Sequence, residues 1–246
     1  MLAWPKYGVT FIYYLKYISI MREFNPLVGY PEPKEPRVVG PNIRTIHNRI
    51  TAAYRDKEYY DGDRNNGYGG FKYDGRWVPV AKNMIREYEI TETSSILQIG
   101  CEKGFLLHDF KQLLPSMNVV GTEISPYAIN NSMPSVKPAI IKAPFTSLPF
   151  ADATFDLVIA IGVVYTLNLA DAIRCLKEIQ RVGKGKSFIT LAAYSTEEEF
   201  QLFRWWTVLG ATILHENEWK EVLQHVGYTG DYKFTTAVTL KLVKKK

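Results

Sequence analysis

A regular alternation constrains the fold of this chain more than any other feature of its sequence. From Thr93 onward, short apolar runs rich in β-formers take turns with stretches in which apolar side chains recur at helical spacing. The runs that predict strands are residues 95–99, 118–122, 139–142, 155–161 and 187–193. Such alternation is typical of parallel strands joined by crossover helices. We therefore expect an α/β fold built on a doubly wound, mostly parallel sheet.

The predicted helices lie between these strands. Apolar side chains share one helical face in residues 106–114, a short helix begins near Pro126, and the spacing of residues 173–182 predicts a longer helix. Further along, a helix that Gly227 caps precedes residues 232–242, which alternate between apolar and polar like a closing strand.

The chain before this region has a different character. Five prolines between residues 25 and 41 favour an extended tether, because proline fixes φ and lacks a backbone donor. Ile46, Ile50 and Tyr54 share one face of a predicted helix, and a loop rich in glycine and aromatic residues follows it. We divide the chain into an N-terminal extension with its tether (1–41), a helical cap with the Gly/aromatic loop (42–90) and the α/β domain (91–246).

The charge distribution argues against nucleic acid as a partner. The formal net charge is +5, but residues 1–50 hold seven Lys and Arg against three acids. The rest of the chain is nearly neutral, whereas a domain that follows a phosphate backbone normally shows a basic stripe. No apolar run reaches the roughly 18 residues of a membrane span, and no secretory signal is evident. We expect a cytoplasmic protein.

Two segments have the character of a ligand site. Residues 96–105 form a buried strand that breaks into a glycine turn and opens a helix, which presents free backbone N–H groups. Glu123 ends the next strand, 23 residues after Gly100, where an acid in nucleotide-binding folds accepts hydrogen bonds from ribose. The alternatives are a plain strand-to-helix turn and a carboxylate that caps the helix near Pro126. Cys101 and Cys175 are isolated, and no metal-ligand spacing appears.

Together with residues 147–167 and 178–187, these segments resemble a class I S-adenosylmethionine-dependent methyltransferase of the small-molecule kind. The resemblance covers roughly residues 80–240. It implies a Rossmann-like, seven-stranded sheet whose last strand is antiparallel. We expect the N-terminal helical cap to precede this sheet in the chain. The loop 68–77 and residues 219–232 are similar to methyltransferases of bacterial surface-polysaccharide loci.

The resemblance also assigns a cofactor, S-adenosyl-L-methionine, and residues to hold it. Gly100, Cys101 and Gly104 would surround its methionine portion, Glu123 would bind the ribose and Phe145 would lie beside the adenine. The set further includes Ile124 and Ile161. Three members depart from the family pattern. Gln98 is an amide where the first strand usually has an acid, and Glu102 is an acid where the turn usually has its middle glycine. Pro144, which has no side-chain acceptor, stands near the adenine amine.

Candidates for acceptor chemistry are fewer. Methyl transfer depends mainly on alignment, and a base helps only hydroxyl acceptors. Tyr165, at the sheet edge, is the first candidate to face the acceptor, and its alternative role is packing under a loop. Two segments crowded with aromatics supply the substrate candidates Tyr68, Arg76 and Trp205.

We therefore predict methyl transfer to a small hydroxylated acceptor such as a carbohydrate. The alternative is a catalytically inactive, methyltransferase-like domain that serves as a binding or scaffolding partner. This alternative depends on the three departures from the family pattern at the cofactor site. It also depends on residues 1–40, which would form an arm that binds a protein partner.

Overall fold

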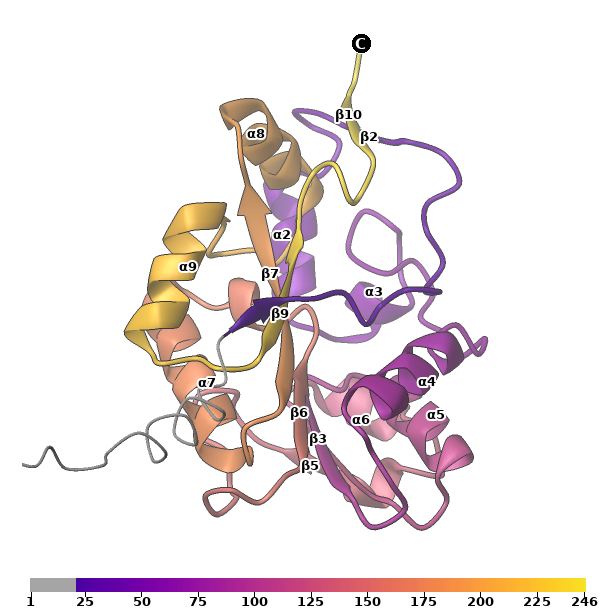
Figure 1. Cartoon of the computed structure of the whole chain (residues 1–246). Coiled ribbons are helices and arrows are strands. Elements are labelled where there is room, and N and C mark those ends of the chain that lie inside the picture. The colour runs from indigo at the N-terminus through magenta and orange to yellow at the C-terminus, as the bar shows by residue number, and fades with distance from the viewer. Residues whose placement is uncertain (1–20) are drawn as a thin grey trace, which may run out of the picture.

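A computed structural model describes residues 21–246 of the chain, and a parallel sheet forms its centre (Figure 1). Seven strands lie in the order β1-β9-β7-β6-β3-β4-β5, with the short β8 (Leu214–His215) also paired to β7. Every pairing in this sheet is parallel. The strands in sheet order are β1 (Arg22–Glu23), β9 (Asp231–Thr235), β7 (Ser187–Tyr194), β6 (Leu157–Ala160), β3 (Ser95–Ile99), β4 (Asn118–Glu123) and β5 (Ile140–Lys142).

Helices cover both faces of the sheet, so the predicted Rossmann-like, doubly wound fold is confirmed. On one face, α7 (Leu169–Val182) and α9 (Glu216–His225) pack into the same hydrophobic core as β6 and β7. On the other face, α4 (Val78–Glu87) and α5 (Phe105–Leu113) pack into a second core. Strands β6 and β7 are buried almost throughout, which explains their unbroken apolar runs. In residues 21–246, no helix has the length and hydropathy to cross a membrane.

The end of the chain differs from the sequence prediction in two ways. Strand β9 runs parallel to β7, not antiparallel, because α9 carries the chain back across the sheet before β9 begins. The predicted strand over 232–242 also stops at Thr235. There Thr236 and Thr239 exchange backbone-to-hydroxyl hydrogen bonds that form a turn. The next strand, β10 (Leu242–Lys244), pairs with β2 (Arg37–Val39) in a separate two-stranded sheet.

The proline-rich segment is held against the domain along much of its length. No helix or strand forms between β1 and β2, as the prolines predict, yet Leu27 and Tyr30 pack against the second core. The ring of Tyr30 lies 4.5 Å from that of Trp77, centroid to centroid. Residues 1–20, half of the arm predicted to dock a protein partner, lie outside the described residues. The partner and the domain divisions stay predictions.

Between this segment and α4 lie α2 (Ile46–Ala53), α3 (Lys57–Tyr60) and the long loop 61–77. The helix predicted from Ile46, Ile50 and Tyr54 is present, but their shared face points to solvent, with 72%, 52% and 73% of each residue exposed. The small residue Ala52 is the one that packs inward. The remaining short elements are α6 (Pro126–Asn130), α8 (Glu197–Trp206) and the 3₁₀ turns η2 (Lys137–Ala139) and η3 (Val164–Thr166).

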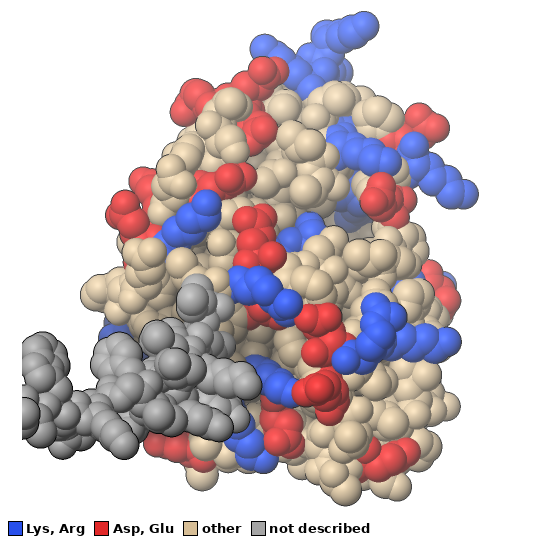
Figure 2. Space-filling model, viewed as in Figure 1, with Lys and Arg blue, Asp and Glu red and all other residues tan. Residues whose placement is uncertain are grey.

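The surface charges are mixed. Figure 2 shows Lys and Arg interspersed with Asp and Glu over the face in view, without a continuous basic stripe. This agrees with the near-neutral sequence after residue 50.

Candidate functional site

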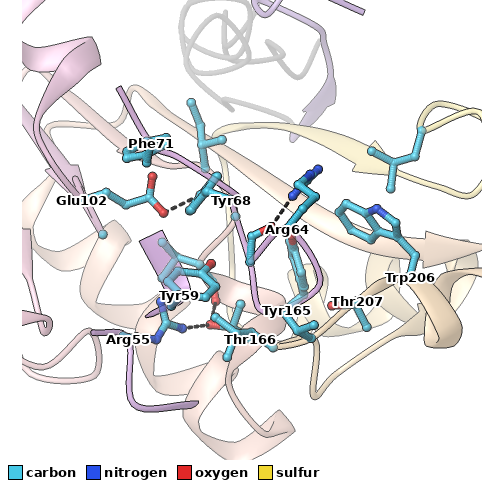
Figure 3. A pocket seen from close by; sticks show the side chains of 18 of the residues that line it. Arg55, Tyr59, Arg64, Tyr68, Phe71, Glu102, Tyr165, Thr166, Trp206 and Thr207 are labelled. Carbon is cyan, nitrogen blue, oxygen red and sulfur yellow. Dashed lines mark hydrogen bonds between the residues drawn. The ribbon is translucent and has the colours of Figure 1, made fainter. Parts of the chain in front are cut away.

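A pocket of about 490 Å³ opens at the carboxyl ends of β3, β4 and β6, where open α/β sheets bind their ligands. One wall is the sheet edge with the glycine turn and the residues around η3. The opposite walls come from loop 61–77, from β2 and from the segment after α8, so regions far apart in sequence meet here (Figure 3). Its volume falls in the range of small-molecule sites.

The turn after β3 requires glycine at its first position. Gly100 has a φ of +64°, and a Cβ there would lie 2.4 Å from Cγ2 of Val163. Gly104, with a φ of +72°, occupies the N-cap position of α5. Glu102 adopts the same left-handed region, with a φ of +53°, although it carries a side chain. The backbone therefore keeps the shape of a glycine turn while a carboxylate replaces the middle glycine.

A buried ion pair fixes this turn against loop 61–77. The ammonium group of Lys103, which is 6% exposed, lies 2.7 Å from Oδ2 of Asp61 and donates to the carbonyl of Phe71 at 2.9 Å. Tyr127 donates its hydroxyl to the same Asp61 oxygen at 2.7 Å. Burial acts to raise the pKa of Asp61, but the hydrogen bonds from Lys103 and Tyr127 outweigh it and hold this pKa below its usual range.

Glu123 is held by three backbone hydrogen bonds. Its Oε2 accepts from the backbone N–H of Glu102 at 2.9 Å, and its Oε1 accepts from those of Ile124 and Ser125 at 2.8 Å each. The residue is 1% exposed and lines the pocket. The alternative role as helix cap is wrong, because the hydroxyl of Ser125 accepts from Ala128 N and caps α6.

The side chain of Glu102 enters the pocket, where the hydroxyl of Tyr68 donates to its Oε1 (Figure 3). Removal from water and the neighbouring Glu123 raise the pKa of Glu102, the hydrogen bond from Tyr68 and the charge of Arg55 act to lower it, and the net pKa is about 8. A carboxyl with this pKa exchanges its proton near neutral pH.

Tyr165 also lines the pocket, on the same wall as the glycine turn. Burial, assisted by the charge of Glu102, raises the pKa of Tyr165 to about 12. Its phenol is therefore protonated at neutral pH and able to donate a hydrogen bond. The backbone carbonyl of Tyr165 accepts from Ala211 and Thr212, which fixes its position relative to the segment after α8.

Arginines gather on the far side of the pocket. Arg37, Arg44 and Arg64 line it together with the ring of Trp206. Arg44 donates to the carbonyls of Trp206 and Arg64, and Arg64 donates to that of Gly67. Burial, together with the charges of Arg64 and Arg37, lowers the pKa of Arg44 to about 10.

Seven of the predicted site residues line the pocket: Gly100, Glu102, Glu123, Ile161, Tyr68, Arg76 and Tyr165. The other seven lie outside its lining: Gln98, Cys101, Gly104, Ile124, Pro144, Phe145 and Trp205.

Three of these positions have specific surroundings. Gln98 is buried in β3, and its Oε1 has no hydrogen-bond partner among the described residues. Arg76 is held in a forked pair with Asp74, its Nη2 lying 2.6 Å from Oδ2. Trp206, and not its neighbour Trp205, reaches the pocket.

Sequence reasoning missed the arginines of the pocket. Arg37, Arg44, Arg55 and Arg64 come from the tether, from α2 and its flanks, and from the loop after α3. They share no local spacing, so only the folded chain brings them together. The single available signal was the excess of bases in residues 1–50.

Comparison with known proteins agrees with this architecture. Residues 97–191 match the model of a methyltransferase domain family. No curated protein sequence matches the chain. Among solved structures, the chain is similar to the YcgJ protein of Bacillus subtilis, with 17% identity and a TM-score of 0.50 over 59% of this chain and 66% of that one.

Two further structures have TM-scores of 0.49. One is a putative methyltransferase of Haloferax volcanii solved with the methyltransferase activator Trm112, at 20% identity over 76% of this chain and 77% of that one. The other is a putative methyltransferase of Bacillus halodurans, at 13% identity over 60% and 68%. The chain thus spans about two thirds or more of each of these three structures. Residues 97–191 are thus similar to a methyltransferase domain, and the fold is the Rossmann-like one predicted from the sequence.

Proposed function

We propose that the pocket transfers a methyl group from S-adenosylmethionine to a small hydroxylated acceptor. One observation carries this proposal. The glycine turn after β3 and the acid at the end of β4 line the same pocket, and the pocket has open space beside them for an acceptor. Gly100 and Glu123 form one side of the pocket, and Tyr165 faces the same space.

The charges at the glycine turn fit the cofactor. S-adenosylmethionine is cationic at its ammonium and sulfonium groups, and Glu102 and Glu123 are the two carboxylates of the pocket lining. A cation beside Glu102 would offset the unfavourable burial of its ionised form. Glu123 uses three of its roughly four acceptor positions on backbone N–H groups, which leaves one for a ribose hydroxyl.

The departures from the family pattern also have a place in this arrangement. Gln98 keeps an unused acceptor, Oε1, behind the turn, where the family has an acid. Glu102, at the middle of the turn, supplies a carboxylate to the pocket in place of the acid that Gln98 replaces. Pro144 lies outside the pocket lining.

The bound cofactor supplies an electrophilic methyl group, and the residues of the chain then need to align the acceptor and remove a proton. Alignment supplies much of the rate of such a transfer. Glu102 is the proposed base, because its pKa of about 8 suits proton exchange with a hydroxyl near neutral pH. Tyr165, protonated at that pH, is proposed to orient the acceptor by donating a hydrogen bond.

Two features support a small hydroxylated acceptor, such as a carbohydrate. The pocket holds about 490 Å³, and its lining includes the rings of Tyr59, Tyr68 and Trp206, which suit the flat faces of sugars. The face in view in Figure 2 mixes both charges and shows no continuous basic track for a nucleic acid. The resemblance to enzymes of surface-polysaccharide loci points to the same class of acceptor.

Calorimetric titration with S-adenosylhomocysteine, the demethylated product, tests the proposal. We expect a Kd below about 100 μM for the unmodified chain, and loss of at least tenfold in affinity for Glu123→Gln. The control is Glu221→Gln, which removes the same charge from an exposed position on α9 and leaves the pocket intact.

No binding at millimolar S-adenosylhomocysteine would contradict the proposal. The chain would then be a methyltransferase-like domain without cofactor, and the scaffolding role would become the better account. Equal loss in Glu123→Gln and Glu221→Gln would place the ligand away from this pocket and would contradict it as well.

A further inference from the structure

We infer that the acceptor carries an oxyanion group, phosphate or carboxylate, which Arg37, Arg44 and Arg64 bind on the far side of the pocket. This inference rests on the proposed function, since it concerns the substrate of the same pocket. It goes beyond that function because a hydroxylated acceptor need not be charged.

The first observation is that these cations have no acidic partner. None of the three arginines forms an ion pair with an Asp or Glu among residues 21–246. Other arginines of the protein do, for example Arg22 with Asp231 and Arg181 with Glu178. The pocket therefore concentrates positive charge that the described chain leaves uncompensated.

The second observation is that the fold holds several positively charged arginines close together on this side of the pocket. The guanidinium groups of Arg37 and Arg44 lie 5.9 and 5.8 Å from the centroid of the Trp206 ring. Arg44 is fixed by carbonyls from two segments. Burial lowers the pKa of both Arg37 and Arg44, and the charge of Arg64 acts on both in the same direction. Mutual repulsion of this kind destabilises a protein, and an anion bound among the three groups would relieve it.

The third observation is that Arg37 has donors to spare. Among the described residues its side chain has no hydrogen bond, and its guanidinium lies 5.9 Å from the centroid of the Trp206 ring. A guanidinium carries five N–H donors in a planar fork that matches the two oxygens of a carboxylate or phosphate. Arg37 is therefore placed to bind a ligand without first breaking a bond within the protein.

The arrangement of charge across the pocket gives the bound acceptor a direction. Figure 3 shows Glu102 on one side and Arg64 with Trp206 on the other. An oxyanion is repelled by the carboxylate of Glu123 at the glycine turn and attracted by the three arginines. The same acceptor then presents its neutral hydroxyl end toward Tyr165 and Glu102, where the proposed transfer takes place.

Calorimetry in a buffer free of oxyanions tests this, with inorganic phosphate and acetate as probes small enough to enter any pocket and glycerol as the uncharged probe. We expect saturable binding of at least one anion and none of glycerol. Arg37→Gln should weaken anion binding about tenfold, because it removes a charge-assisted contact. Arg37→Lys should retain most of it. Arg86→Gln, which removes a charge from an exposed position on α4, is the matched control and should change it less than twofold.

The two anions distinguish the chemical source of the charge. Binding of phosphate alone assigns a phosphorylated acceptor, and binding of acetate with comparable affinity assigns a carboxylate. Saturable binding of neither anion overturns the inference, and so does an equal effect of Arg86→Gln and Arg37→Gln.

Titration of the same samples with S-adenosylhomocysteine separates this inference from the proposed function. If the cofactor product binds and no anion does, the inference fails and the methyl transfer proposal stands. If an anion binds through Arg37 and the cofactor product does not bind, the anion site stands and the proposed function fails. Thermal melting of Arg37→Gln and Arg37→Lys checks that both variants are folded.

Discussion

At the scale of single residues, Glu102 is the position where this chain departs most from the pattern that it resembles. A carboxylate replaces a glycine in a left-handed backbone conformation, and it lies beside a second carboxylate, Glu123. Such a residue destabilises the fold in two ways, through backbone strain and through the burial of charge. A residue with this cost is expected where function requires it.

The sign of its effect on stability follows from its pKa. The pKa of Glu102 is about 8 in the folded protein, against 4.5 as the ordinary value. Between these values the folded chain binds a proton that the unfolded chain has lost, so stability falls as pH rises through this window. Glu102→Gln should remove that fall. Between pH 4.5 and pH 8.5, the free energy of unfolding of Glu102→Gln should rise relative to that of the unmodified protein by on the order of 4 kcal/mol.

Urea denaturation at the two pH values measures this difference. Glu221→Gln, on the exposed surface of α9, is the control and should leave the pH dependence unchanged. An unaltered slope in Glu102→Gln would show that the carboxyl of Glu102 is not the group that titrates.

At the scale of elements, the glycine turn depends on loop 61–77 for its position. Three aromatic rings surround the ammonium group of Lys103 while it pairs with Asp61, at 5.6 to 5.9 Å from each ring centroid. The loop and the turn both contribute walls of the pocket, so this pair holds two of its walls together.

Asp61→Ala should therefore cost about 3 kcal/mol of stability, because it leaves the ammonium of Lys103 buried without its counter-charge. Asp74→Ala is the matched control, since its pair with Arg76 lies on the same loop but is exposed, and it should cost less than about 1 kcal/mol. Chemical denaturation gives both values. Equal costs would mean that burial of the pair contributes nothing.

Most helices and strands of the domain were predictable from the sequence. The strand pairing at the C-terminal end of the chain was not. Periodicity located β3, β4, β6 and β7 because each is a short apolar run beside a strong helical pattern. The alternation over 232–242 was misleading, since Thr236 and Thr239 read as strand residues and form a turn instead. Spacing showed the helix α2 but not which of its faces is buried.

Some residues of the site were likewise predictable from the sequence and others were not. Gly100 and Glu123 could be predicted, because a local motif places each at the end of a neighbouring strand. The arginines could not, because β2, the flanks of α2 and the loop after α3 meet only through the tertiary fold.

At the scale of the whole molecule, β1 ties the N-terminal segment to the far end of the sequence. Arg22 donates to both carboxylate oxygens of Asp231, at 2.9 and 2.7 Å, and also to Glu87. Asp231 is 8% exposed and accepts from Tyr88 as well. The segment that follows β1 supplies Tyr30 and Arg37 to the pocket, so docking of this part of the chain and completion of the site are coupled.

Arg22→Ala should lower the free energy of unfolding by about 2 kcal/mol, because Asp231 loses its counter-charge while it remains buried. Arg174→Ala breaks an exposed pair with Asp171 and should cost less than about 0.5 kcal/mol. Urea midpoints measure both. If the two variants lose the same stability, the tie between β1 and β9 does not contribute as described.

The central claim is that one pocket has an acidic end for the cofactor and a basic end for the acceptor. A crystal structure of the protein with S-adenosylhomocysteine tests it most directly. The account predicts the ligand at the ends of β3 and β4, with a ribose hydroxyl on Glu123 and with Arg37, Arg44 and Arg64 still facing open space. A ligand bound among the arginines, or no ligand in the pocket at saturating concentration, would contradict it.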